Sequence, residues 1–235
     1  MDQKMKKWQS FVIGGSNAIA VRKAEKFECG KEKYRQLFIY GATGSRKTAL
    51  SKMVRKHMFE KGLTIRMRYA DDFTGELVQW LTKGYLLSGY LNSYRDVDVL
   101  ILEDIQYLTG RPTVSEVLME LIDMMQKQNK RIWLTADSKD ILAKWNVKDF
   151  HTVKLFDMDT GMKKKVLKQY AKMKGYSVSD EVFTMLADKN ENIRTLQGML
   201  NQAAFYQGWT GRLFDEKLLH DIQRLEQRNW KRWID

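Results

Sequence analysis

The 235-residue sequence contains one cysteine and one proline, and each scarcity excludes a class of protein. Cys29 has no partner for an internal disulfide, which predicts a reducing, cytoplasmic environment. With Pro112 as the single proline, we expect no long irregular linkers and a mostly helical build. No apolar run approaches the roughly 20 residues of a membrane-spanning helix, and the first ten residues lack the hydrophobic core of a signal peptide. We therefore expect neither a secreted nor a membrane-spanning protein.

Acidic residues are also few relative to basic ones. The sequence has 41 basic and 29 acidic side chains, and its formal net charge is +12. An excess of this size favours a polyanionic partner, nucleic acid first and an anionic membrane surface second. The alternative is that many of the lysines are solvated helix faces. We expect a cytoplasmic, nucleoid-associated protein that does not bind membranes.

Short apolar runs alternate with longer amphipathic stretches up to about residue 160. The runs predicted as strands are 36–41, 64–70, 98–104, 131–137 and 151–157, and the stretches predicted as helices are 47–61, 71–91 and 114–129. Continuous apolar strands are expected where both faces of a parallel sheet are covered. This alternation predicts a three-layer α/β domain.

The strand pattern stops near residue 160, and helical patterns follow over 161–175, 179–190, 192–208 and 215–233. We therefore expect two domains. The first, 1–158, would be the α/β domain. The second, 159–235, would be a small all-α lid that ends in a basic and aromatic helix.

The segment GATGSRKT (41–48) directly follows the apolar run LFIY. Glycines allow a loop to turn its N–H groups inward and to approach phosphate oxygens closely. With Gly41, Gly44, Lys47 and Thr48 in place, the segment fits a loop whose lysine contacts the β- and γ-phosphates and whose hydroxyl contacts Mg²⁺. Arg46 replaces the last glycine, where a left-handed backbone would cost about 1 kcal/mol or more. We predict a phosphate loop that tolerates nucleotide but is compromised in hydrolysis, against the alternative of a basic turn before a helix.

Acidic residues end two of the predicted strands. Glu103 and Asp104 follow four apolar residues in VLILEDIQYL, where paired acids hold Mg²⁺ and orient an attacking water. Asp137 ends RIWLTAD beside Thr135, from which it could sense the γ-phosphate or that water. Arg194, in NIRTLQGMLN, lies near the start of a lid helix and could reach back to the nucleotide. The alternative for the acids is that they end their strands without binding a ligand. The alternative for Arg194 is that it is an ordinary surface arginine.

Taken in order, these segments resemble the AAA+ core of the bacterial chromosomal replication initiator DnaA family, over almost the whole chain. FVIGGSNAIA (11–20) is similar to the family's first motif, beside the adenine. YADDF and the residues that lead into VLILED resemble its initiator-specific insertion, and LTAD and NIRTLQGMLN resemble its sensor 1 and sensor 2 motifs. The resemblance implies a AAA+ P-loop fold with a helical lid, and ATP or ADP with Mg²⁺ as cofactors. It makes 1–158 the nucleotide-binding domain and places the initiator-type helical insertion at about 71–96.

Carried over position by position, the resemblance implies a role for each matching residue. It implies contacts with adenine or ribose at Val12, Ile13 and Asn17, and with phosphates at the loop residues Gly41, Thr43, Gly44, Ser45, Arg46, Lys47 and Thr48. It implies Mg²⁺ at Thr48, Glu103 and Asp104, catalysis by Glu103, Asp104 and Asp137, and a sensor 2 contact from Arg194.

Two groups of residues are candidates for nucleic-acid contact. The resemblance implies single-stranded DNA along the insertion region, where Lys83 and Arg95 are plausible phosphate contacts. The tail QRNWKRW places Arg228, Trp230 and Lys231 together, a composition suited to stacking on bases and contacting phosphates. The alternatives are solvated charges and a terminal helix that docks its tryptophans on the lid.

The departures from the family point to a truncated and altered member. Where the family carries an arginine finger, the sequence reads VKDFHTV, with Asp149 at the arginine position and Lys148 beside it. We find no segment that resembles the family's helicase-recruiting or helix-turn-helix domains. We therefore expect at most a slow ATPase, with nucleotide-dependent self-assembly weakened by the missing finger.

The favoured interpretation is a DnaA-like protein of replication initiation that acts as an accessory initiator, helicase loader or regulator. A phage or mobile element is one origin consistent with the sequence, and the host chromosome is the other. The protein's partners would be single-stranded DNA and a replication protein, either DnaA or the replicative helicase. One rival is a nucleotide-independent adaptor or inhibitor with a degenerate site that docks on a replication protein. Another is a plain nucleic-acid-binding module, whose affinity would fall with salt regardless of ATP.

Overall fold

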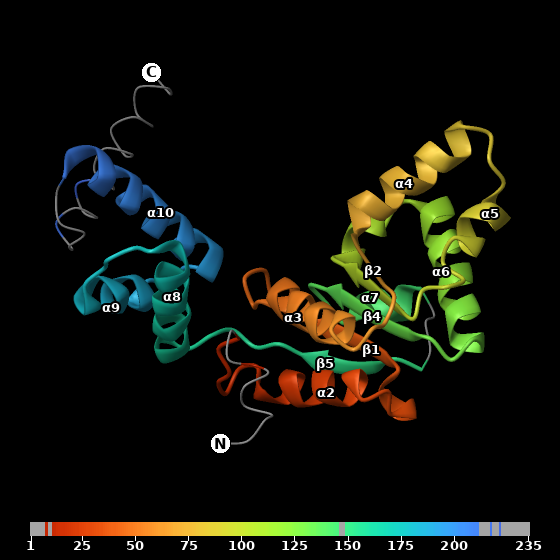
Figure 1. Cartoon of the computed structure of the whole chain (residues 1–235), viewed down its shortest axis with the longest axis horizontal. Coiled ribbons are helices and arrows are strands. Elements are labelled where there is room, and N and C mark those ends of the chain that lie inside the picture. The colour runs from red at the N-terminus through yellow and green to blue at the C-terminus, as the bar shows by residue number, and fades with distance from the viewer. Residues whose placement is uncertain (1–7, 9–10, 146–148, 212–216, 218–220, 222–235) are drawn as a thin grey trace. The chain divides into compact units, whose positions relative to one another are not determined.

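The computed structural model describes residues 8, 11–145, 149–211, 217 and 221, and the chain divides into two compact units. The first unit extends to Asp157 and the second begins at Met158. In Figure 1 the first unit contains a sheet covered by helices, whereas the described part of the second contains helices alone. The sequence-based division into a nucleotide-binding domain and a lid stays a prediction, because compactness assigns no role to either unit.

In the described part of the chain, five parallel strands form one sheet in the order β2-β3-β4-β1-β5. Their bounds are β1 Gln36–Tyr40, β2 Ile65–Tyr69, β3 Val99–Glu103, β4 Arg131–Ala136 and β5 His151–Lys154. Every residue of β3 is buried, whereas the edge strand β2 is only half-buried. Strands buried on both faces read as continuous apolar runs, which is why VLILE was recognisable from sequence. The predicted α/β class is confirmed.

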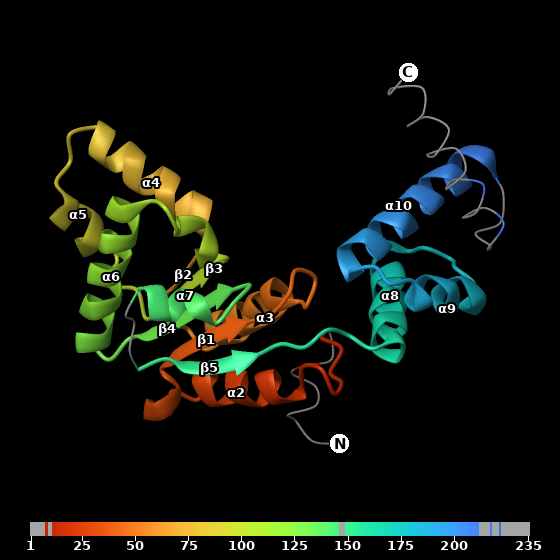
Figure 2. The same cartoon turned by 180° about the vertical axis from the view of Figure 1, so that it is seen from behind.

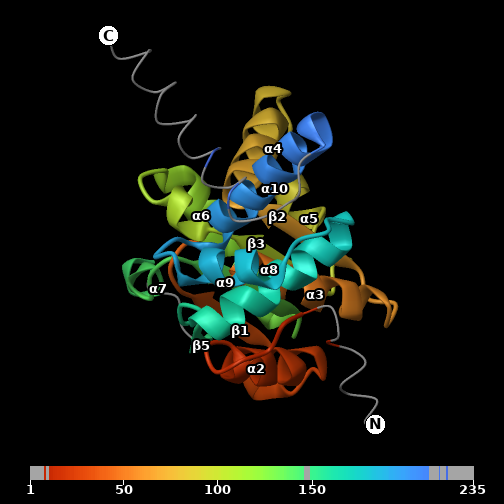
Figure 3. The ribbon, with the colours of Figure 1, turned by 90° about the vertical axis from the view of Figure 1, so that its left-hand side faces the viewer.

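Helices cover both faces of this sheet, as Figures 2 and 3 show, with α2 and α3 on one side and α6 and α7 on the other. The helices of the first unit are α2 Ala18–Glu28, η1 Glu32–Tyr34, α3 Lys47–Phe59, α4 Ala70–Thr82, α5 Leu87–Asn92, η2 Ile105–Leu108, α6 Pro112–Lys127 and α7 Asp140–Lys144. Because strand side chains alternate between faces, the sheet builds two cores. Phe27, Leu50 and Trp133 belong to one, and Phe73 and Leu121 to the other.

The structure corrects the predicted elements in three places. The helix predicted over 71–91 is two helices, α4 and α5, separated near Gly84, whose φ of 78° is left-handed. The helices α2 and α7 were not predicted. The last strand ends at Lys154 rather than at 157, since only four residues pair with β1.

The described part of the second unit is built from α8 Thr160–Lys174, α9 Asp180–Asp188 and α10 Ile193–Thr210. The side chain of Asp159 caps α8, and that of Asn192 caps α10. Lys164 and Lys168 both pair with Asp180 and hold the pKa of that carboxyl below its usual value. Of the helix predicted over 215–233, only residues 217 and 221 are described.

None of the helices in the described residues combines the length and the apolar character needed to cross a bilayer.

Candidate functional site

Residues 41–48 connect the carboxyl end of β1 to the first turn of α3. Gly41 is buried beneath the chain that follows β5, and a Cβ atom there would lie 2.4 Å from the carbonyl oxygen of Leu155. Its N–H donates to the carbonyl of Ala136 in β4 at 3.2 Å. Gly44 has a φ of 88°. Glycine is therefore required at the first position by a close backbone approach and at the second by a left-handed turn.

Lys47 is the first residue of α3 and is only 7% exposed. Its ammonium donates to the carbonyl oxygens of Gly41 at 2.7 Å and Ala42 at 3.2 Å. The hydroxyl of Ser45 is buried and makes no hydrogen bond, although hydroxyls in such positions normally find a partner. The carbonyl groups of the loop thus bind the ammonium of Lys47, and the hydroxyl of Ser45 is a further hydrogen-bond donor in the same loop.

Arg46 occupies the left-handed region, with φ 71° and ψ 27°, immediately before α3. Its guanidinium carbon lies 4.6 Å from the ring centre of Phe11, and its Nη1 is buried without a hydrogen-bond partner. Burial lowers the pKa of this guanidinium to about 10. A buried cation of this kind is stabilised by the aromatic ring and lacks an anion.

The segment 11–17 lies against the loop and against the chain after β5. Asn17 is buried, and its side-chain amide accepts from the N–H of Gly14 and donates to the carbonyl of Val12, both at 2.9 Å. Ser16 accepts a backbone hydrogen bond from Phe156. Ile13 is 45% exposed. Asn17 is therefore a brace for the turn, while Val12 and Ile13 supply apolar surface.

Glu103, the last residue of β3, is fully buried, and neither carboxylate oxygen accepts a well-formed hydrogen bond from any described residue. Burial raises the pKa of this carboxyl, and the nearby Asp104 raises it further. The hydroxyls of Ser51 and Thr48 and the ammonium of Lys47 act in the opposite direction, because they face the carboxylate from α3. An isolated buried carboxylate is costly unless a proton or a cation neutralises it.

This donor set fits Mg²⁺. Mg²⁺ prefers oxygen ligands, retains several waters and is held in phosphate loops by one hydroxyl, one or two carboxylates and the phosphates themselves. Glu103 supplies an unpartnered carboxylate, and Thr48 supplies a hydroxyl that faces it. The described residues contain no cluster of three or more carboxylate, histidine or cysteine side chains, and a site of this kind does not need one.

Asp104 lies in the left-handed region with φ 57°, just beyond β3. Its N–H donates to Oγ1 of the buried Thr135 in β4 at 3.0 Å. Asp137, after the end of β4, is exposed. The structure therefore brings Glu103 and Asp104 beside the loop and links them to β4 through Thr135 rather than through Asp137.

Two buried residues of this region were missed by the sequence analysis. The indole N–H of Trp133 donates to Oγ of Ser51 at 2.7 Å, and that hydroxyl donates to the carbonyl of Lys47 at 3.2 Å. Ser51 lies one helical turn after Lys47, on the face that meets Glu103. This helical spacing was the available signal for Ser51, whereas Trp133 gave none beyond its apolar strand.

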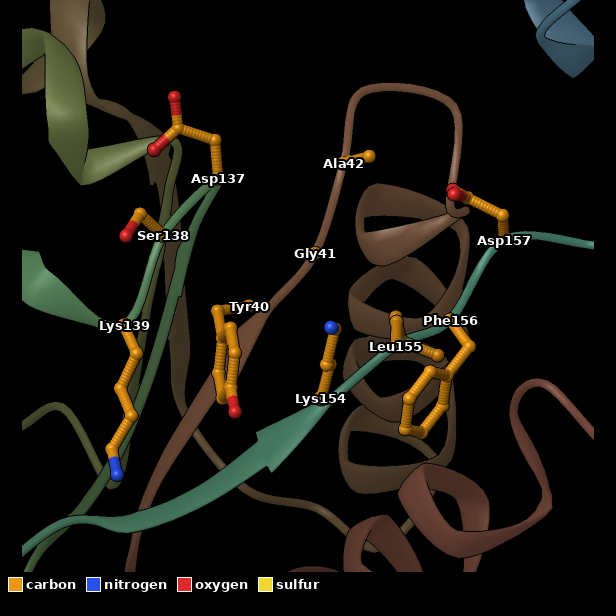
Figure 4. Close-up of a pocket in the computed structure, with 10 residues that line it drawn as sticks. All are labelled: Tyr40, Gly41, Ala42, Asp137, Ser138, Lys139, Lys154, Leu155, Phe156 and Asp157. Carbon is orange, nitrogen blue, oxygen red and sulfur yellow. The ribbon is translucent and has the colours of Figure 1, made fainter.

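A cavity of about 410 Å³ opens beside the start of the loop. Three chain segments meet there, from the ends of β1, β4 and β5, as Figure 4 shows. The lining residues are Tyr40, Gly41, Ala42, Asp137, Ser138, Lys139, Lys154, Leu155, Phe156 and Asp157. In open α/β sheets ligands bind outside the carboxyl ends of the strands, which is where this cavity lies.

The other predicted site residues belong to other elements of the chain or fall outside the described residues. Lys83, at the end of α4, and Arg95, after α5, are both exposed. Asp149 is exposed with a φ of 66°, and Lys148 is not described. Arg194 is exposed in the first turn of α10, within the second unit. The predicted tail contacts Arg228, Trp230 and Lys231 fall outside the described residues.

The parallel sheet, the loop between β1 and α3 and the acids at the end of β3 give the chain the fold of the DnaA and RuvB structures described as domain III of DnaA and as a branch migration motor. The sequence model of the bacterial DnaA ATPase domain family matches residues 2–151, and the chain belongs to this family.

Relatives and solved structures agree with this assignment. The chromosomal replication initiator protein DnaA of Symbiobacterium thermophilum is 29% identical over 214 residues, which are 85% of this chain and 46% of that protein. The chain thus spans about half the length of the curated relatives it matches. Domain III of the Thermotoga maritima replication initiation protein DnaA has the same fold, with a TM-score of 0.81 and 23% identity over 90% of this chain and 92% of that one. A replication initiator DnaA bound to AMPPCP and single-stranded DNA has a TM-score of 0.73 and 22% identity, over 97% and 69% of the two chains.

Proposed function

We propose that this protein binds adenine nucleotide and Mg²⁺ at residues 41–48 and acts with DNA in replication initiation. The observation that carries the proposal is the meeting of Lys47, Thr48 and the unpartnered Glu103 at the carboxyl edge of the sheet. A loop lysine, a helix N-terminus and a buried carboxylate are the parts that a nucleotide with its cation requires. A solved DnaA of the same fold is bound to AMPPCP, a nucleotide analogue.

Each part of the site has a separate task in this proposal. The N–H groups of residues 43–48 and the ammonium of Lys47 bind the phosphates, and Arg46 adds a second cation. Thr48 and Glu103 hold Mg²⁺, which supplies charge neutralisation for the phosphates when bound. Val12 and Ile13 face the base, and Asn17 keeps their turn in place.

Hydrolysis is slow in this proposal. We assign the orienting of water to the carboxylates of Asp104 and Asp137. In assemblies of this fold class an arginine finger can complete a neighbour's site, and its charge contributes a large part of the rate. Asp149 stands at the matching position, where it offers a negative charge. Binding of nucleotide, rather than its hydrolysis, then switches the DNA affinity of the protein. Arg194 takes the sensor 2 role that the family resemblance implies.

Single-stranded DNA is the proposed polyanion. The net charge of +12 favours one, and Lys83 and Arg95 present exposed cations on the insertion region. A solved DnaA of this fold is bound to single-stranded DNA. The protein would act as an accessory initiator, helicase loader or regulator beside DnaA or the replicative helicase.

The test is titration calorimetry of the protein with ATP and with ADP in the presence of Mg²⁺, beside Lys47→Ala. We expect micromolar binding that Lys47→Ala weakens at least about 10-fold, because it removes a charge-assisted contact to phosphate. Fluorescence anisotropy with single-stranded DNA would then be measured with ATP, with ADP and without nucleotide. A DNA affinity that is the same in all three states would exclude the switch.

A nucleotide-independent adaptor is the second candidate, and one observation favours it. Arg46 stands in the left-handed position that a phosphate loop normally gives to glycine, and its side chain occupies partly buried space above Phe11. Absence of nucleotide binding by the wild-type protein, together with capture of purified DnaA or helicase, would support this candidate instead.

A further inference from the structure

Basic side chains gather at the amino ends of three neighbouring strands, the opposite edge of the sheet from residues 41–48. β1 follows Lys33 and Arg35, β4 begins at Arg131 and β5 begins at His151. We define the basic edge as Lys23, Lys26, Lys33, Arg35, Arg131 and His151.

Strand register holds these residues together. Gln36 pairs with Ile132 and Leu37 pairs with His151, so Arg35, Arg131 and His151 stand at the starts of adjacent strands. Helix α2 packs along β5 and brings Lys23 and Lys26 to the same edge (Figure 2).

Tyr34 is the centre of the cluster. Its ring is 8% exposed and meets the ring of His151 edge-on at 4.7 Å. The ammonium groups of Lys23 and Lys26 each donate to its hydroxyl oxygen at 3.3 Å, and each lies 4.9 Å from its ring centre. Two cations thus converge on one phenol oxygen, which can accept hydrogen bonds but carries no charge to oppose theirs.

Carboxylates do not neutralise this edge. Among the described residues, no ion pair joins any of the six side chains to an acid, although Glu32 lies in the same turn. Asp98, the acid that acts on Arg131, pairs with Lys130 at 3.7 Å instead.

The electrostatics of two members agree with an unopposed positive field. Burial lowers the pKa of His151, and the charges of Lys23, Lys33 and Lys26 lower it further. Burial and the charge of Arg35 lower the pKa of Arg131 more than Asp98 raises it, and Nη1 of Arg131 is buried without a partner. Like charges held this close are destabilising unless an anion joins them.

We propose that the basic edge binds phosphate groups of the DNA backbone, as a second DNA contact remote from the nucleotide site. This proposal depends on the proposed function in one respect, which is that DNA is the polyanion that the protein binds. A lipid surface fits less well, because membrane binding needs apolar side chains to insert as well as charge. Among the described residues, Ile19 is the one large exposed apolar side chain on α2, and η1, β1, β4 and β5 contribute none.

The experiment compares the full chain with the variant Lys23→Gln/Lys26→Gln in binding fluorescein-labelled single-stranded oligo(dT) over a range of salt concentrations. Each phosphate contact on a single strand contributes about 0.7 to the slope of log K against log salt, so two lost contacts should reduce the slope by about 1.4. At about 0.1 M salt the affinity should fall roughly 10-fold or more. Nucleotide binding should be unchanged.

The matched control is Lys52→Gln/Arg55→Gln, two exposed cations with the same spacing on α3. It removes the same net charge. The slope of log K against log salt should differ from that of the wild type by no more than about 0.35, which is half the value for one phosphate contact. Lys33→Gln, an exposed position of the basic edge, should reduce the slope by about 0.7 and gives an independent second variant.

Equal slopes for the wild type and both edge variants would overturn the proposal and leave nucleotide-dependent DNA binding intact. The salt slope could fall in the edge variants while the DNA affinity of the wild type is the same with and without nucleotide. That result would support DNA binding by the basic edge and refute the proposed nucleotide switch. Failure of the wild type to bind DNA would overturn the basic edge as a DNA contact. Loss of binding to phosphatidylglycerol vesicles in the edge variants, with DNA binding unaffected, would assign the site to lipid.

Discussion

The backbone N–H of Asp104 donates a hydrogen bond to Oγ1 of Thr135 at 3.0 Å, and this bond ties the end of β3 to the end of β4. Asp104 has a left-handed backbone, which is costly for a residue other than glycine. The bond to a buried hydroxyl compensates part of that cost and holds Glu103 and Asp104 in a single arrangement beside the loop.

Replacing Thr135 tests this link. Thr135→Val keeps the shape of the side chain but leaves the N–H of Asp104 without its acceptor, which should cost about 1–3 kcal/mol in the free energy of unfolding. Thr135→Ser retains the hydroxyl and should lose less. Urea denaturation of both variants measures the difference, and a valine variant as stable as the serine variant would contradict the role of the bond.

Substitution of Arg46 decides whether this residue blocks or supports nucleotide binding. Its buried Nη1 lacks a partner, and a phosphate would provide one. Arg46→Gly should therefore weaken ADP binding about 10-fold, since charge-assisted hydrogen bonds contribute about 1.5–3 kcal/mol. Arg46→Lys retains the charge and should lose less in the same calorimetric titration. Tighter binding by the glycine variant would show that the arginine obstructs the site.

The raised pKa of Glu103 predicts that the free energy of unfolding falls as pH rises. Its pKa in the folded protein is raised above the ordinary value of 4.5, so from about that pH upward the folded state holds a proton that the unfolded state has lost. Stability is then lost as pH climbs toward the folded pKa. Glu103→Gln should remove this loss, so the variant should be more stable than wild type at pH 8 and closer to it at pH 5.

The measurement for Glu103 is urea denaturation at both pH values without Mg²⁺. Glu120→Gln, at an exposed position of α6, is the control for a general effect of removing one negative charge. A Glu103→Gln variant whose advantage is the same at pH 5 and pH 8 would be inconsistent with the raised pKa.

Gly41 is predicted to tolerate no side chain. A Cβ there would lie 2.4 Å from the backbone oxygen of Leu155, so Gly41→Ala should destabilise the protein by about 1–3 kcal/mol. Gly75→Ala, in α4 with open space around it, should instead add up to about 1 kcal/mol. Thermal unfolding compares the two, and similar shifts in Tm would argue against the close approach at Gly41.

Much of the first unit was predictable because its signals are local. The first four residues of VLILE are apolar because β3 is buried on both faces, and the glycines of GATGSRKT mark a loop whatever surrounds it. The break between α4 and α5 was missed, because the apolar pattern continues through Gly84 while its left-handed backbone ends the helix. Helix α2 was missed although its first three residues, 18–20, end the motif FVIGGSNAIA, because no helical pattern was assigned to the residues that follow.

The sequence by itself determined the fold class, the family and the position of the glycine-containing loop at residues 41–48, since chain order and short-range pattern carry all three. Only the tertiary structure decided that Glu103 is buried without a partner, that Thr135 rather than Asp137 anchors Asp104, and that Arg46 stacks on Phe11. It also decided that lysines of α2 and a histidine of β5 meet at one tyrosine. These relationships join residues far apart in the chain, and strand register and helix packing, which no local pattern specifies, bring them together.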